Sequence, residues 1–94
     1  QVAPAELEAL LLGHPAIADV AVIPSPDDEA GEVPKAFIVA KQEIDAEEIQ
    51  EWVAAQVSPH KKIRRVEFVT EIPKSISGKI LRRVLVEQER AKLG

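Results

Sequence analysis

The chain has 94 residues, 46% of them hydrophobic, so we expect one domain with a single modest core, small for a complete two-substrate enzyme. It contains no cysteine, which excludes disulfide frameworks, thiolate metal sites and cysteine nucleophiles and fits a reducing compartment such as the cytoplasm. No charged leader or long apolar run is readable, so we expect neither a signal peptide nor a membrane partner.

The net charge of −4 is unevenly distributed along the chain. Residues 1–60 contain twelve acidic and two basic side chains, whereas residues 61–94 contain four acidic and ten basic ones. The C-terminal third is therefore expected to attract anions. Nucleic-acid binding is the weaker interpretation, because only Trp52, Phe37 and Phe68 are large aromatic residues and none offers a stacking platform beside the basic run.

The first half of the chain predicts a helix followed by two strands. Residues 4–12 read as a helix, because leucines recur at helical spacing behind an N-terminal proline and acidic residues. Residues 17–23 are rich in β-forming side chains and end at Pro24 and Pro26, which predicts a short strand. Residues 35–40 are apolar on both faces and are expected to pair with that strand as a hairpin.

The second half predicts a helix, a short strand and a last helix. Asp45 and Glu48 form a capping-box pattern before an apolar stripe, so residues 46–57 read as a helix. Residues 66–69 alternate as a strand, and residues 80–92 have helical spacing. The order α, β, β, α, β, α predicts an α+β domain, a small sandwich with a three-stranded, mostly antiparallel or mixed sheet and three helices.

Between the last strand and the last helix lies a polar segment with four basic side chains in ten residues, at residues 74–83. Gly78 permits a backbone turn, and Ser75 and Ser77 can hydrogen-bond locally. Lys79 is thereby presented near a predicted helix N-terminus, where free N–H groups and the helix dipole favour anions. This composition predicts a site for a phosphate or a carboxylate.

Two other interpretations of Lys79 have to be weighed. Most exposed lysines in turns are only solvated. A nucleotide-binding P-loop would need an earlier glycine and a serine or threonine after the lysine, whereas Ile80 follows it here. We reject the P-loop and keep the solvated lysine as the alternative to a functional one.

Three segments resemble one known family. Residues 73–83 read Pro-Lys-Ser-Ile-Ser-Gly-Lys-Ile-Leu-Arg-Arg and resemble the C-terminal signature of the adenylate-forming ligases, which include acyl-CoA synthetases, luciferases and peptide-synthetase adenylation domains. Residues 1–8 resemble the segment after the interdomain hinge of that family, and residues 31–37, Gly-Glu-Val-Pro-Lys-Ala-Phe, resemble one of its strand entries. The resemblance covers the whole chain and is closest to 4-coumarate–CoA ligases and luciferases.

This resemblance implies that residues 1–94 are a single domain, the mobile C-terminal domain of an AMP-forming acid–CoA ligase whose N-terminal domain and hinge are absent from this sequence. The whole enzyme would form an acyl-adenylate and pyrophosphate from a carboxylic acid and ATP, and then acyl-CoA and AMP with coenzyme A. Mg²⁺ would arrive with ATP and be held mainly by the N-terminal domain. Luciferase-like oxidation stays open within the family, and the isolated domain is expected to be inactive.

The resemblance also assigns roles to residues. Lys79 matches the catalytic lysine that touches the substrate carboxylate and the α-phosphate oxygens, and Gln1 matches a glutamine beside the hinge that faces the active site. Ser77 and Gly78 join the nucleotide-binding residues. Candidates for contacts to the coenzyme A phosphates are Lys61, Lys62, Arg64, Arg65, Arg82 and Arg83. The first four of these side chains could instead form only a solvated basic face.

Three further expectations concern partners and metals. A lysine acetyltransferase and deacetylase acting on Lys79 would remove and restore its charge. No metal site is expected, because the acidic turn at residues 27–29 lacks the ligand spacing of a calcium loop. A different functional class also stays open: a free-standing module that binds a nucleotide or an acidic partner through the basic face of residues 61–83.

Overall fold

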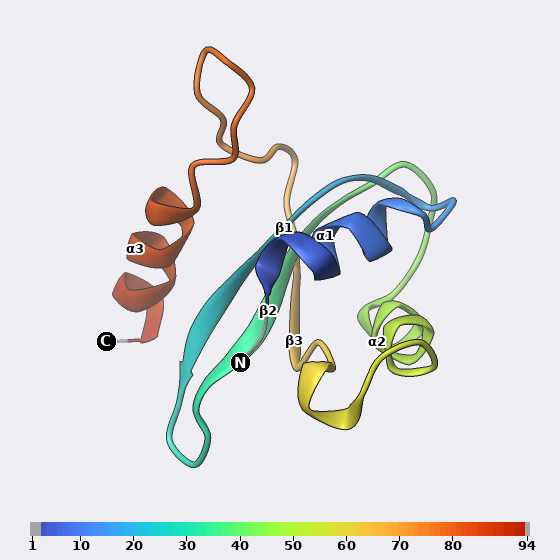
Figure 1. The fold of residues 1–94 in the computed structure, drawn as a ribbon. Helices are drawn as coiled ribbons and strands as arrows, with labels where there is room; N and C mark the ends of the chain where they lie inside the picture. Colours follow the sequence, from blue (N-terminus) through green and yellow to red (C-terminus); the bar gives the residue numbers. More distant parts are fainter. Residues whose placement is uncertain (1–2, 94) are drawn as a thin grey trace.

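The computed structural model describes residues 3–93. Its elements follow the order predicted from the sequence, with a short 3₁₀ turn, η1, added before the third strand (Figure 1). The elements are α1 (Pro4–Leu12), β1 (Ile17–Asp27), β2 (Gly31–Ala40), α2 (Ala46–Ala54), η1 (Pro59–Lys61), β3 (Arg65–Phe68) and α3 (Arg82–Leu93).

The three strands form one mixed sheet in the order β1-β2-β3. β1 and β2 pair antiparallel, which confirms the predicted hairpin, and β2 and β3 pair parallel. The parallel pair requires a crossover, and α2 with η1 supplies it. β1 and β3 are therefore the two edges of the sheet, and β2 is its centre.

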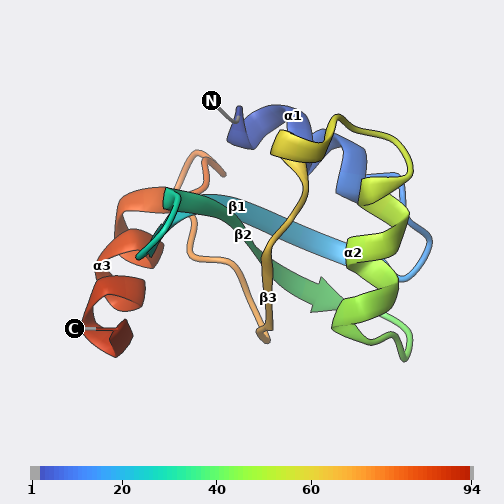
Figure 2. The same ribbon diagram turned by 90° about the horizontal axis from the view of Figure 1, so that it is seen from below.

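Helices cover both faces of the sheet. α1 and α2 lie on one face and α3 lies on the other (Figure 2). Alternate residues of β1 enter opposite cores, since Val20 and Val22 pack towards α1 and α2 whereas Ala21 and Ile23 pack in the cluster that contains Leu85 of α3. Burial on both faces explains why the strands are apolar without alternation.

The first strand is longer than predicted. We expected it to end at residue 23, but β1 continues through Pro24 and Pro26 to Asp27. The N–H group of Val22 points to the free edge, where the carboxylate of Glu8 accepts it at 2.8 Å. Pro24 and Pro26 follow Val22 by two and four residues, so their backbone nitrogens also face the free edge of the sheet. No hydrogen bond between β1 and β2 is therefore lost.

The second helix begins as predicted and ends earlier. Asp45 caps it, with its side chain accepting the N–H of Glu48 at 2.8 Å. The helix ends at Ala54 instead of residue 57, because the chain then turns into η1, which starts at Pro59. The capping pattern was a local signal and is confirmed, whereas the helix end depends on the return of the chain to the sheet.

A buried charge network joins α3 to the sheet. The ammonium group of Lys35 on β2 lies 2.6 Å from Glu89 of α3 and 2.9 Å from Glu67 of β3. The hydroxyl of Ser25 donates to Glu89 at 2.8 Å, and Lys92 of α3 donates to Glu67 at 2.6 Å. Only 8% of Lys35 and 2% of Glu89 are exposed, so this pair is an internal part of the fold.

The hydrogen bonds of this network outweigh the effect of burial on its pKa values. Burial by itself would lower the pKa of Lys35, but its bonds to Glu89 and Glu67 raise that pKa. Burial would likewise raise the pKa of Glu89, yet the bonds from Lys35 and Ser25 lower it. The pKa of Glu67 is lowered by the bonds from Lys92 and Lys35. All three groups are therefore held in their charged forms.

These pKa shifts predict how stability depends on pH. Because the carboxyl pKa values of Glu67 and Glu89 are depressed, their contribution is present above the ordinary value of 4.5 and is lost as the pH falls through the folded values. The raised pKa of Lys35 adds a contribution that is present below 10.5 and lost as the pH rises through its folded value. Urea denaturation across this range measures the effect, and a free energy of unfolding that does not fall in acid would contradict it.

Candidate functional site

The lysine loop, residues 73–80, is a hairpin that projects away from the sheet and helices (Figure 1). The N–H of Gly78 bonds to the carbonyl of Ser75 at 2.9 Å, and the N–H of Ser75 bonds to the carbonyl of Lys79 at 2.9 Å. Gly78 has φ +87°, the left-handed conformation that this three-residue connection needs and that glycine adopts without strain. The turn predicted at Gly78 is confirmed.

The last helix begins later than predicted, which changes the setting of Lys79. We expected a helix at residues 80–92, but Ile80 is paired with Lys74 across the hairpin and α3 starts at Arg82. Lys79 therefore lies on an extended hairpin and not at a helix N-terminus. Attraction of an anion at this point rests on the ammonium charge of Lys79 and not on the helix dipole.

The two lysines of the hairpin have different surroundings. The ammonium group of Lys74 lies 2.6 Å from a carboxylate oxygen of Asp19 at the start of β1. Lys79 is exposed and takes part in none of the ion pairs found among residues 3–93. Its backbone N–H bonds to the hydroxyl of Ser75 at 3.2 Å, and that hydroxyl lies 2.9 Å from the hydroxyl of Ser77. The backbone at Lys79 is thus held by hydrogen bonds, while the residue is exposed.

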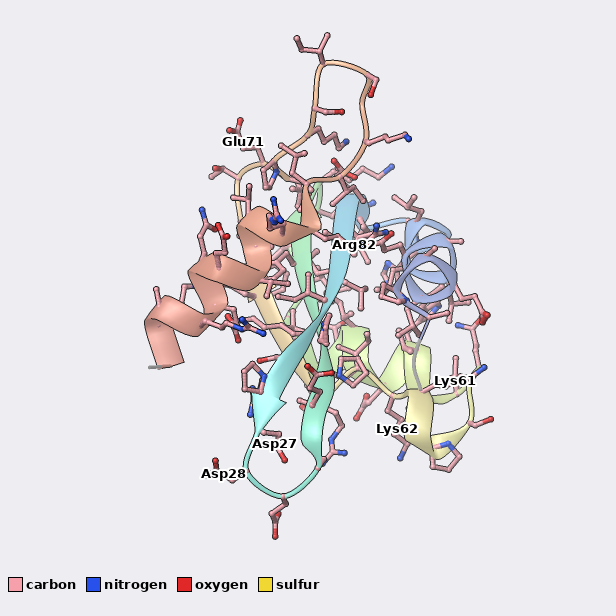
Figure 3. The ribbon with its side chains drawn as sticks, turned by 60° about the vertical axis from the view of Figure 1, so that its left-hand side comes forward. Asp27, Asp28, Lys61, Lys62, Glu71 and Arg82 are labelled. Carbon is pink, nitrogen blue, oxygen red and sulfur yellow. The ribbon has the colours of Figure 1, made fainter. Side chains whose placement is uncertain are left out.

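The basic candidates are divided between two ends of the molecule. Lys61 and Lys62 lie at η1, at the opposite end of the sheet from the lysine loop and from Arg82 (Figure 3). Lys61 forms a 3.8 Å ion pair with Glu6, and Lys62 is exposed. Arg83 is also exposed and follows Arg82 at the start of α3. The chain by itself does not bring these four residues together into one phosphate site.

Two arginines of the basic segment already have acidic partners within the fold. Arg82 binds the buried carboxylate of Glu8, with its Nε 3.1 Å from Oε2. Arg65 donates to the hydroxyl of Ser25 at 2.6 Å and to Asp27 at 3.1 Å. Their charges are therefore engaged in holding elements together, and an incoming phosphate would have to compete for them.

The acidic turn after β1 has a structural role. Asp27 accepts the N–H groups of Ala30 at 2.9 Å and Glu29 at 3.2 Å, and the bond from Ala30 is the main reason that the pKa of Asp27 is lowered. In residues 3–93 no group of three His, Cys, Asp or Glu side chains is arranged to hold a metal ion. Gln1, the second catalytic candidate, lies outside the described residues.

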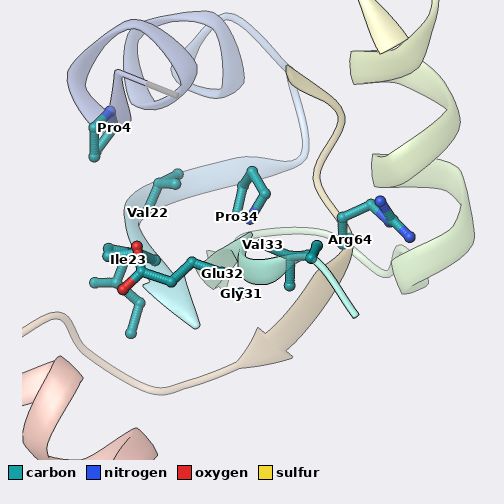
Figure 4. Close-up of a pocket in the computed structure, with 10 residues that line it drawn as sticks. Pro4, Val22, Ile23, Gly31, Glu32, Val33, Pro34 and Arg64 are labelled. Carbon is teal, nitrogen blue, oxygen red and sulfur yellow. The ribbon is translucent and has the colours of Figure 1, made fainter. Parts of the chain in front are cut away.

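A cleft on the surface of the described residues lies away from the lysine loop. Figure 4 shows it at the β1–β2 hairpin, where Glu32 and Arg64 are the charged side chains among the described residues that line it. The remaining lining residues are Pro4, Val22, Ile23, Pro24, Ala30, Gly31, Val33 and Pro34. The candidate site is thus an exposed cation on a projecting hairpin and not an enclosed pocket, so the groups that enclose a substrate would have to come from another domain.

Comparison with known proteins shows the family. The model of the AMP-binding enzyme C-terminal domain matches residues 6–79, most of the chain. The chain belongs to this family. Within residues 3–93, no helix of this AMP-binding C-terminal domain is long and apolar enough to cross a membrane.

Relatives of this AMP-binding C-terminal domain are much longer than the chain. It is 62% identical over 90 residues to a protein of Oryza sativa subsp. japonica named 4-coumarate–CoA ligase-like 5, covering 94% of this chain and 17% of the relative. It is also 62% identical over 92 residues to 4-coumarate–CoA ligase of Pinus taeda, covering 98% of this chain and 17% of the relative. The chain thus spans about a sixth of the length of these relatives.

Solved structures share the fold. A fatty acyl-CoA synthetase of Mycobacterium tuberculosis superposes with a TM-score of 0.90 at 39% identity, covering 97% of this chain and 18% of the other. The anthranilate–CoA ligase AuaEII in complex with anthranoyl-AMP superposes with a TM-score of 0.89 at 35% identity, covering 98% of this chain and 19% of the other. The predicted resemblance to adenylate-forming enzymes is confirmed at the level of sequence and of structure.

Proposed function

We propose that this chain is the mobile C-terminal domain of an ATP-dependent carboxylic acid–CoA ligase and that Lys79 is its adenylation cation. The observation that carries the proposal is the contrast within one hairpin: Lys74 is bound to Asp19, whereas Lys79 is exposed and free of ion pairs among the described residues. The relatives reported above are named as CoA ligases, which favours thioester formation over luciferase-like oxidation.

A mobile cation suits the first half-reaction. When a carboxylate attacks the α-phosphate of ATP, two anions approach each other and charge develops on the oxygens between them. A lysine is a compact point charge on a flexible stem, and the hairpin carries it beyond the body of the domain. Ser77 and Gly78 would lie beside the nucleotide because they precede Lys79 in the same turn.

The remaining substrate contacts would come largely from elsewhere in the full-length protein. Mg²⁺ would arrive bound to ATP and neutralise phosphate charge, with its protein ligands in the N-terminal domain. Gln1 would approach the site from the hinge. For the coenzyme A phosphates, Lys61 and Lys62 at one end and Arg82 and Arg83 at the other act as alternative contacts, reached in different orientations of the domain.

The function is tested with the full-length protein. A panel of acids that includes 4-coumarate, fatty acids and anthranilate is incubated with Mg-ATP, and acid-dependent pyrophosphate release is measured before and after coenzyme A is added. We expect pyrophosphate release with at least one acid, followed by acyl-CoA formation. The isolated chain is expected to be inactive. Full-length protein that binds ATP without acid-dependent pyrophosphate release would argue against the proposal.

Two parts of the proposal concern the cellular setting. Acetylation of Lys79 by a lysine acetyltransferase would remove its charge and stop adenylation, and a deacetylase would restore it. Mass spectrometry of the native protein tests this, and a Lys79 that stays unmodified under all growth conditions would refute the acetylation proposal.

The cytoplasm stays the proposed location, although one relative, from Arabidopsis thaliana, is named a peroxisomal CoA ligase.

A further inference from the structure

Glu8 holds three elements together from a buried position. It lies on α1, only 6% of it is exposed, and its Oε2 accepts the N–H of Val22 at the free edge of β1. The same oxygen lies 3.1 Å from Nε of Arg82, and its other oxygen pairs with the same guanidinium group. A buried carboxylate is costly unless it is paired in this way, so its partners are fixed in position.

A second acidic residue holds the other leg of the hairpin. Asp19 binds Lys74, which enters the lysine loop, whereas Glu8 binds Arg82, which follows it. The two legs are also bound to each other, because Leu81 donates its N–H to the carbonyl of Pro73 at 2.9 Å and Lys74 pairs with Ile80. The hairpin is thus an arm whose base is clamped on both sides.

We propose that Glu8 and Asp19 are positioning residues that set the direction in which this arm carries Lys79. The inference rests on the proposed function of Lys79. Neither carboxylate touches a reacting atom; each acts through the basic residue that it holds. A reacting group displaced by about 1 Å loses on the order of 10²-fold in rate, so a small rotation at the base of the arm is enough to slow adenylation.

The variants Glu8→Gln and Asp19→Asn in the full-length protein test the clamp. Glu8→Gln keeps the size of the side chain and an acceptor for Val22 but removes the charge that holds Arg82. We expect kcat of adenylation to fall about 10-fold to 100-fold with little change in KM for ATP or acid. Thioester formation from supplied acyl-adenylate should change less than adenylation. Asp19→Asn should act in the same direction with a smaller effect, because its pair is partly exposed.

Glu6→Gln is the matched control. It lies on the same helix, its side chain is exposed, and its 3.8 Å contact with Lys61 is remote from the arm. We expect it to leave adenylation unchanged. If Glu8→Gln slows both half-reactions equally and lowers the melting temperature in proportion, its role is structural and the inference is overturned.

A measurement without catalysis keeps the inference separate from the proposed function. Spin labels at the exposed positions 76 and 51 report the distance between the arm and α2 in the full-length protein. We expect Glu8→Gln to shift or broaden the distance distribution, and an unchanged distribution overturns the inference. Absence of adenylation by the unsubstituted protein would refute the proposed function alone, whereas a large Lys79→Ala effect together with normal adenylation by Glu8→Gln would refute only the clamp.

Discussion

Replacing Lys79 with alanine in the full-length protein is expected to slow acyl-adenylate formation by about 10²–10³-fold, the usual cost of removing one group that stabilises developing charge. The effect should fall on kcat, because the ammonium group meets the reacting oxygens mainly in the transition state. Thioester formation from supplied acyl-adenylate should remain largely intact. Pyrophosphate release and single-turnover thioester formation measure the two steps separately.

Lys41→Ala serves as the control for this experiment. Lys41 is also exposed and is free of ion pairs among residues 3–93, but it follows β2 and is not part of the lysine loop. Its replacement should leave both half-reactions unchanged. If Lys79→Ala slowed both half-reactions equally, Lys79 would have a structural role instead. If it slowed neither, Lys79 would be only a solvated surface lysine.

Replacing Glu89 with glutamine is expected to destabilise the fold by about 3 kcal/mol, because it leaves the buried ammonium of Lys35 without its nearest counter-charge. Glu67 still pairs with Lys35, so the expected loss of stability is at the lower end of the range for a broken buried ion pair. Urea denaturation followed by circular dichroism measures the change in the free energy of unfolding at neutral pH.

Glu87→Gln is the matched substitution on the same helix, because Glu87 is exposed. It should change stability little, as expected of a surface residue. The double variant Lys35→Met with Glu89→Leu should recover much of the loss, since apolar side chains of similar volume can replace a buried ion pair. Equal destabilisation by Glu87→Gln and Glu89→Gln would show that helix charge and not the buried pair controls stability.

Features encoded by neighbouring residues were predictable from the sequence. The Asp45 cap and the turn at Gly78 each depend on a few adjacent positions, and both were predicted correctly. The length of β1 was not, because tolerance of Pro24 and Pro26 depends on the strand being an edge of the sheet, which is a tertiary property.

Long-range pairs in the candidate site left no readable signal. Lys79 was found because its motif is contiguous, but Glu8 read only as an acidic residue in a first helical turn. Its partner Arg82 lies 74 positions away and was predicted only as a contact for the coenzyme A phosphates. The clamp at the base of the hairpin therefore became visible only in three dimensions.

The placement of α3 shows that the folding unit extends beyond the region matched by the family model. The matched family region ends at Lys79, whereas Leu85 of α3 packs in the cluster that contains Phe37, and Glu89 of α3 pairs with Lys35. A chain shortened after Lys79 would retain the ammonium group of Lys79. It would, however, expose Phe37 and leave the buried ammonium group of Lys35 without Glu89. α3 is thus needed to complete the fold from which the hairpin with Lys79 projects.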